Sequence, residues 1–196
     1  QNNRKIAIIG SIMSKLIIII ILLVILVAGV FIYQSGSDSK IMKTNTLKLT
    51  SSAFEHNGDI PEKYTCDGQN FSPPLAITGV PPATKSLALI VHDPDAAPPA
   101  GGGWDHWLIY NLPPSTTVLG EGEPPAGTLG LGSGGNANYE GPCPPSGTHR
   151  YFFKLYALDL ELPLAIGSSK GELEAAMKGH ILDQAELIGR YARTKV

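Results

Sequence analysis

Polar side chains stand at the ends of several apolar stretches of this 196-residue chain, and their types suit the binding of a small oxyanion. An imidazole donates or accepts hydrogen bonds near neutral pH, and a neighbouring carboxylate holds it in its donating tautomer or raises its pKa. The alternative is that these groups are strand-end residues whose hydrogen bonds are satisfied locally. The residues concerned are Asp93, Asp95, Asp105, His106, His149 and Tyr151.

The apolar stretches that carry these residues are typical of β-strands, because they are rich in branched and aromatic side chains. They span 86–92, 106–112 and 149–160. If the first two are antiparallel neighbours, Asp93 lies beside His106 at one rim of a sheet. In the third, His149 and Tyr151 share a face with later apolar residues, because side chains alternate along a strand. The pattern predicts that the polar groups converge on one pocket.

The rest of the domain indicates an antiparallel β-sandwich with one short helix. Pro- and Gly-rich segments separate the predicted strands and exclude long helices there. A serine at 168 or 169 is a suitable N-cap for a helix over 169–179 that ends near a glycine. Residues 185–193 alternate enough to form a last strand.

The N-terminal part predicts a membrane segment. Residues 16–33 are uncharged and almost wholly apolar, which is just long enough for a transmembrane or signal-anchor helix. The segment 1–15 is basic, which places the domain on the extracytoplasmic side of a single-pass membrane protein. A cleaved signal, which would give a secreted protein, and a buried soluble helix are the alternatives. Residues 34–46 form a linker, and 47–196 the domain.

Charge and motifs exclude several classes of function. The formal net charge is −2 with no basic cluster, so we expect no nucleic-acid partner. The glycines of 130–135 match a dinucleotide pattern, but the following "NANYEGPCPP" cannot begin a helix. A hydrolase built on His106 and His149 would need a nucleophile or a third metal ligand, and none can be named. We therefore expect a protein that is not an enzyme and has no cofactor or metal.

The two cysteines, Cys66 and Cys143, allow two interpretations. Outside the cytoplasm they could form a disulfide that closes a long loop, stabilising the fold by about 3–4 kcal/mol. Alternatively, they are independent small packing residues.

Three ordered motifs give the chain a resemblance to the phosphatidylethanolamine-binding protein family, most closely to its bacterial and archaeal, Raf-kinase-inhibitor-like branch. The motifs are "HDPDAA", "WDHWLIYNLP" and "GPCPPSGTHRYFFKLYAL", and "IPEKYTCDGQNFSPPL" and "GHILDQAELIGRY" are similar as well. The resemblance covers about residues 47–194 and implies a two-sheet β-sandwich with an anion pocket. The pocket residues that it implies are Asp93, His106, Pro144, Pro145, His149 and Tyr151.

The resemblance implies a non-enzymatic binding protein for phosphate-type head groups, here tethered to a membrane and regulating a partner protein. Some members of the family inhibit kinases or serine proteases, so these are the partner classes that it implies. The alternative function is a serine-protease inhibitor that presents a surface loop such as 113–135.

Overall fold

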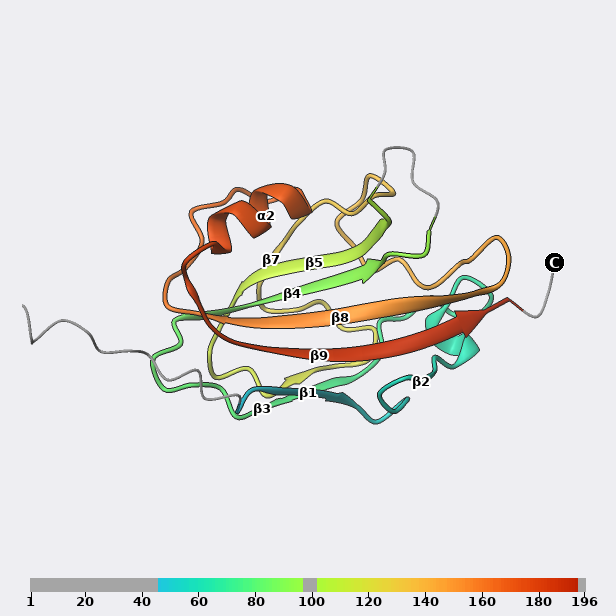
Figure 1. Cartoon of the computed structure of the whole chain (residues 1–196), viewed down its shortest axis with the longest axis horizontal. Coiled ribbons are helices and arrows are strands. Elements are labelled where there is room, and N and C mark those ends of the chain that lie inside the picture. The colour runs from blue at the N-terminus through green and yellow to red at the C-terminus, as the bar shows by residue number, and fades with distance from the viewer. Residues whose placement is uncertain (1–45, 97–101, 194–196) are drawn as a thin grey trace, which may run out of the picture. The chain divides into compact units, whose positions relative to one another are not determined.

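Two β-sheets form the domain in the computed structural model, which describes residues 46–96 and 102–193 (Figure 1). The smaller sheet has the order β1-β3-β6, formed by Lys48–Ser51, Leu75–Thr78 and Val118–Leu119. The larger has the order β2-β9-β8-β4-β5-β7, formed by Gly58–Asp59, Ile181–Ala192, Thr148–Leu158, Ser86–Asp93, Trp104–Leu112 and Thr128–Leu129. The pairs are antiparallel except β2 with β9, which is parallel.

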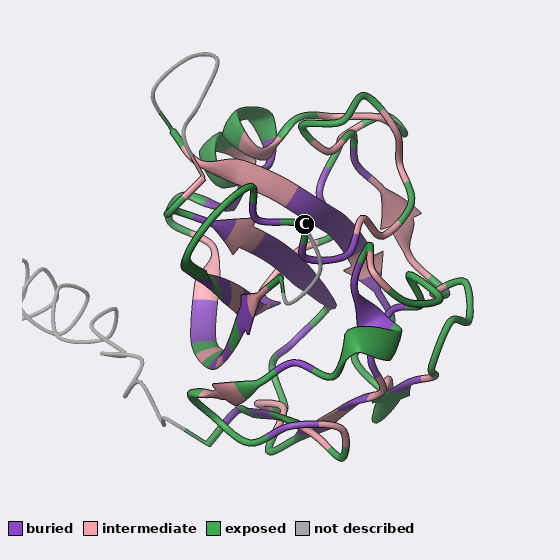
Figure 2. Cartoon of the chain, turned by 90° about the vertical axis from the view of Figure 1, so that its right-hand side faces the viewer, coloured by how far each residue is buried: buried purple, intermediate pink, exposed green. Residues whose placement is uncertain are grey.

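The main core lies between the two sheets. Leu49 and Ile77 of the small sheet belong to the same buried cluster as Leu89, Phe153 and Leu155 of the large sheet. Figure 2 shows this buried layer from the end at which β4 and β9 finish. Because side chains alternate along each strand, the odd-numbered residues of β4 and β8 face this core.

A second, smaller core lies on the other face of the large sheet, where α2 (Lys170–Met177) covers it. Leu173 and Met177 of α2 pack in one cluster with Ile90 and Leu108. Ser169 caps the helix, accepting a hydrogen bond from the backbone N–H of Glu172 in a reciprocal capping box. The predicted short helix is confirmed. A 3-10 turn, η1 (Glu62–Tyr64), follows β2.

The mainly β, two-sheet part of the predicted fold agrees with the structure, but the transmembrane helix is corrected. Across residues 46–96 and 102–193, no helix is long and apolar enough to cross a membrane. The eight residues of α2 extend only about 12 Å, against about 30 Å of bilayer core.

The segment for which the membrane helix was predicted, 16–33, lies outside the described residues, as do 1–15 and nearly all of the linker 34–46. The predicted single-pass membrane location, with the domain on the extracytoplasmic side, depended on that helix and is corrected with it.

Candidate functional site

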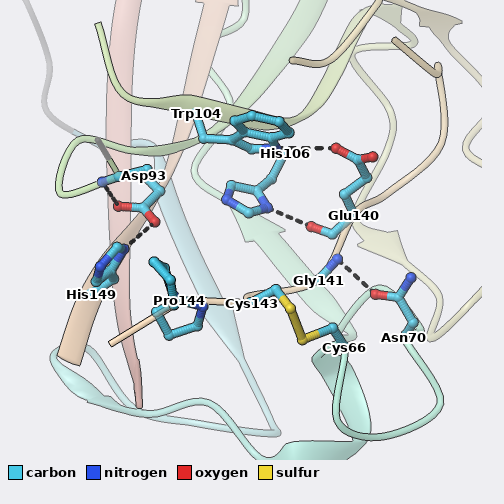
Figure 3. A pocket seen from close by; sticks show the side chains of 12 residues that line it. Cys66, Asn70, Asp93, Trp104, His106, Glu140, Gly141, Cys143, Pro144 and His149 are labelled. Carbon is cyan, nitrogen blue, oxygen red and sulfur yellow. Dashed lines mark hydrogen bonds and ion pairs between the residues drawn. A yellow bond between two sulfur atoms is a disulfide. The ribbon is translucent and has the colours of Figure 1, made fainter. Parts of the chain in front are cut away.

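A cavity of about 440 Å³ opens at one end of the large sheet, where β4 ends and where β5 and β8 begin. Figure 3 shows side chains from these strand ends facing two loops across it. Of the predicted pocket residues, Asp93, His106, Pro144, Pro145 and His149 line this cavity. Tyr151 does not line it, although it lies close behind one wall.

Asp93, the last residue of β4, orients the imidazole of His149 at the start of β8. The His149 Nδ1–H donates to Asp93 Oδ2 over 2.8 Å, and both side chains are nearly buried. The other carboxylate oxygen, Oδ1, accepts from the backbone N–H groups of Asp95 and Ala96 at 2.8 and 3.1 Å. The carboxylate is therefore occupied by three donors, and it holds His149 in one tautomer.

A β-bulge brings His106 to the cavity. Val91 pairs with Trp107, but the next residue of β4, His92, pairs with Asp105, which leaves His106 as the extra residue of β5. In a regular ladder His106 would face α2, because its neighbour Trp107 faces the main core. The bulge turns it to the same face as Trp107, where it packs edge-on against Tyr151 with ring centroids 5.2 Å apart.

Glu140 fixes His106 through its backbone. The His106 Nδ1–H donates to the Glu140 carbonyl over 2.7 Å, and the Glu140 N–H donates to the His106 carbonyl over 3.0 Å. Burial lowers the pKa of His106 despite the opposing effects of the Glu140 carbonyl and of the Asp93 carboxylate. The other ring nitrogen, Nε2, is buried and has no hydrogen-bond partner.

Tyr151 is almost completely buried behind His106. Its hydroxyl lies near the Asp93 carboxylate but forms no hydrogen bond of ordinary geometry. Burial, followed by the nearby charge of Asp93, raises the pKa of Tyr151 above its ordinary value, so the group stays a neutral phenol. Tyr151 packs against the imidazole of His106 and helps to hold that ring in place, but it does not itself form part of the cavity surface.

Two loops close the cavity opposite the strand ends, and a disulfide joins them. Cys66 and Cys143 are bonded, with their Cα atoms 5.4 Å apart, and both line the cavity. Beside the disulfide, the Gly141 N–H donates to Asn70 Oδ1 over 2.7 Å, and the Cys66 N–H donates to the Pro142 carbonyl over 3.1 Å. The wall is thus held by a covalent bond and two hydrogen bonds.

The two remaining aspartates of the predicted cluster lie elsewhere. Asp95 forms a two-point ion pair with the exposed guanidinium of Arg150. Asp105 lies on the α2 side of the sheet, where it accepts from His92 Nδ1 over 2.7 Å and contacts Lys170 Nζ over 3.3 Å. Neither carboxylate lines the cavity.

Sequence reasoning missed Trp104, Asn70 and Glu140 as cavity residues. The Trp104 indole N–H donates to Glu140 Oε2 over 3.2 Å, and Asn136 donates to Oε1 over 2.6 Å. Trp104 could have been found as the residue that opens the "WDHW" motif. Glu140 gave no usable signal, because its contact with His106 uses a backbone carbonyl that every residue possesses.

Across the described residues, no group of three His, Cys, Asp or Glu side chains is placed to hold a metal ion. The arrangement is instead that of a small binding pocket. Two imidazoles, each with its Nδ1–H bound to a protein acceptor, face one cavity between strand ends and a disulfide-linked, proline-containing wall.

A two-sheet β-sandwich with such a cavity at one end of its large sheet defines a class of small binding domains. The sequence model of the phosphatidylethanolamine-binding protein family matches residues 50–192, and the chain belongs to this family. The resemblance seen in the sequence is therefore confirmed.

Solved structures and curated proteins show the same relationship. A phosphatidylethanolamine-binding protein homologue from Chlamydia trachomatis, CT736, has 45% identity and a TM-score of 0.74, covering 76% of this chain and 99% of its own. Escherichia coli YbcL, of the same family, has 32% identity and a TM-score of 0.70, with coverages of 76% and 99%. A UPF0098 protein of Methanothermobacter thermautotrophicus is 52% identical over 153 residues, covering 75% of this chain and 99% of that protein.

Proposed function

We propose that the cavity binds a small oxyanion, such as phosphate or the phosphate of a phosphoethanolamine-like head group, and that the protein is a non-enzymatic binding protein. The observation that carries the proposal is the pair of imidazoles, His106 and His149, each oriented at Nδ1 and facing one cavity. Its volume of about 440 Å³ lies within the range of small-molecule sites.

The walls of this cavity favour binding because they are held in place before a ligand arrives. Pro144 is buried and Pro145 follows it, and the adjoining loop is bonded to Cys66 and to Asn70. A proline has a fixed φ, so little conformational freedom remains to be lost when the ligand binds. The energy of each contact with the ligand is then available for affinity.

Affinity for phosphate and for phosphoethanolamine tests the proposal, measured by calorimetry on the full chain. A charge-assisted hydrogen bond contributes about 1.5–3 kcal/mol net, so His106→Ala or His149→Ala should weaken binding about tenfold to a hundredfold. His180→Ala is the matched control, because His180 also pairs with an aspartate, Asp159 over 2.9 Å, but lies outside the cavity. Its affinity should equal that of the wild type.

No detectable binding of either ligand by the wild type, or equal affinities in all four proteins, would disprove the proposed site. Serine-protease inhibition through 113–135, and the regulation of a protease or kinase partner, stay predictions. Inhibition of a protease that survives His106→Ala would favour the surface loop over the cavity.

A further inference from the structure

In both imidazoles of the cavity, the ring hydrogen on Nδ1 is already donated to an acceptor of the protein. A carbonyl and a carboxylate can only accept, so the Nδ1 atoms that face the Glu140 carbonyl and Asp93 both carry a hydrogen. In the neutral ring the other nitrogen, Nε2, is then a bare acceptor. For His106 this nitrogen is buried and unpartnered, and Figure 3 shows it turned toward the side of the pocket where Asp93 and His149 lie.

A bare Nε2 cannot bind an oxyanion without a hydrogen between them, because both atoms present lone pairs. The carboxylates of the pocket do not relieve this mismatch. Asp93 already accepts three hydrogen bonds and Glu140 accepts from two side chains, so neither provides a donor. A hydrogen must therefore arrive together with the ligand.

We propose that His106 makes the pocket select an oxyanion together with one proton: the ligand binds with a hydrogen between its oxygen and His106 Nε2. This inference rests on the proposed function and specifies it further. An anion that carries its own hydrogen, such as monohydrogen phosphate, donates it to Nε2. An anion without one, such as sulfate, binds only when Nε2 takes a proton from solution, which forms an imidazolium.

The groups around His106 decide how readily that imidazolium forms. The Asp93 carboxylate at the end of β4, and the Glu140 carbonyl and carboxylate, favour the charged ring, whereas burial and the nearby His92 oppose it. From β8, His149 faces the same cavity and the neutral Tyr151 hydroxyl lies behind the ring. Burial outweighs the rest and lowers the pKa of His106, so the free protein holds the neutral ring at pH 7. A bound anion adds a further negative charge beside the ring and so favours the imidazolium.

Sulfate and monohydrogen phosphate test this directly, because they share shape and charge and differ by one hydrogen. In calorimetry on the full chain between about pH 7.5 and pH 9, sulfate affinity should fall at least about tenfold per pH unit, with uptake of at least about one proton per ligand in buffers of different ionisation enthalpy. Phosphate affinity should change by less than about twofold over the same range, without proton uptake. At the upper end, phosphate should bind at least about tenfold more tightly than sulfate.

The variant His106→Gln distinguishes proton uptake at His106 from a general loss of anion binding. The glutamine amide N–H₂ can donate near the position of Nε2, but it cannot take up a proton. In this variant sulfate binding should lose most of its pH dependence, and the preference for phosphate should shrink. If the variant does not fold, the ¹⁵N NMR signal of His106 in the wild type answers the same question. It should report a bare Nε2 in the free protein and a protonated Nε2 with sulfate bound.

Sulfate affinity that is constant with pH, without proton uptake, would overturn the inference while leaving the anion pocket intact. An Nε2 that already carries hydrogen in the free protein would overturn it as well. If neither anion binds to the wild type, the proposed function and this inference both fail.

Discussion

The disulfide between Cys66 and Cys143 should contribute much of the stability of this domain. The bond joins residues separated by 77 positions, a span that contains two of the three strands of the small sheet and three of the six strands of the large sheet. In the chain-entropy description, closing a loop of that length reduces the conformational entropy of the unfolded state, which raises its free energy by about 4.5 kcal/mol at 25 °C. A typical domain is stable by only about 5–15 kcal/mol, so this is a large share.

The native state should survive the loss of the bond, because the two loops have other contacts. The Gly141 N–H still donates to Asn70, and the Cys66 N–H to the Pro142 carbonyl. Loss of the bond should therefore act mainly on the unfolded state, whose conformational entropy rises when the loop is no longer closed. We expect reduced protein to keep its β-rich circular dichroism spectrum and to unfold at lower urea concentration.

Urea unfolding of the full chain, oxidised and reduced, measures this difference, and Cys66→Ser/Cys143→Ser is the reference. The reductant should lower the free energy of unfolding of the wild type by about 4–5 kcal/mol and should not affect the double variant. A loss below about 1 kcal/mol would refute the reasoning, because it would mean that the unfolded chain is already compact around these loops.

Two further predictions concern packing and charge. Gly189→Ala should lower the free energy of unfolding by about 1–3 kcal/mol, because an added Cβ would lie 2.4 Å from Ile60 Cγ1. Gly171→Ala, with nothing within 4 Å of the added Cβ, should leave stability unchanged or raise it by up to about 1 kcal/mol, and the reverse order in urea unfolding would contradict this packing. Hydrogen bonds from Arg150 lower the pKa of Asp95 from 3.8 to about 2, so the stability that this pair adds is present above pH 3.8 and is lost as the pH falls toward 2. An NMR titration should show this pKa rising toward 3.8 in Arg150→Gln, and an unchanged value would mean that the pair does not form in solution.

The regular parts of the fold could be predicted because their signals are local. The run 86–92 is apolar at nearly every position, as a strand buried on both faces requires, and it forms β4. A serine suited to the N-cap and a glycine near the end of the segment predicted α2. By contrast, β2, β6 and β7 have two residues each, and such strands exist only through their partners in the folded sheets.

The site was predictable where it depends on alternation and not where it depends on irregular backbone. His149 lies on the core face of β8, two residues before the buried Tyr151, as the pattern predicts. The partner of Asp93 could not be chosen in advance, and it is His149 rather than His106. The pairing of the cysteines also stayed open, since it depends on the distance between two loops far apart in sequence.

The bulge in β5 explains how acidic residues and an imidazole can share this rim. In a regular ladder Asp105 would face the cavity, where its charge would repel an anion, and His106 would face the apolar layer under α2. The extra residue exchanges these positions. It places the imidazole of His106 in the cavity and Asp105 on the other face, beside Lys170. There burial opposes the charged carboxylate, but the hydrogen bond from His92 and the charge of Lys170 outweigh it and lower the pKa of Asp105. One irregular residue thus keeps the carboxylate of Asp105 out of a cavity that Asp93 and Glu140 already line, and puts a group that can be protonated in its place.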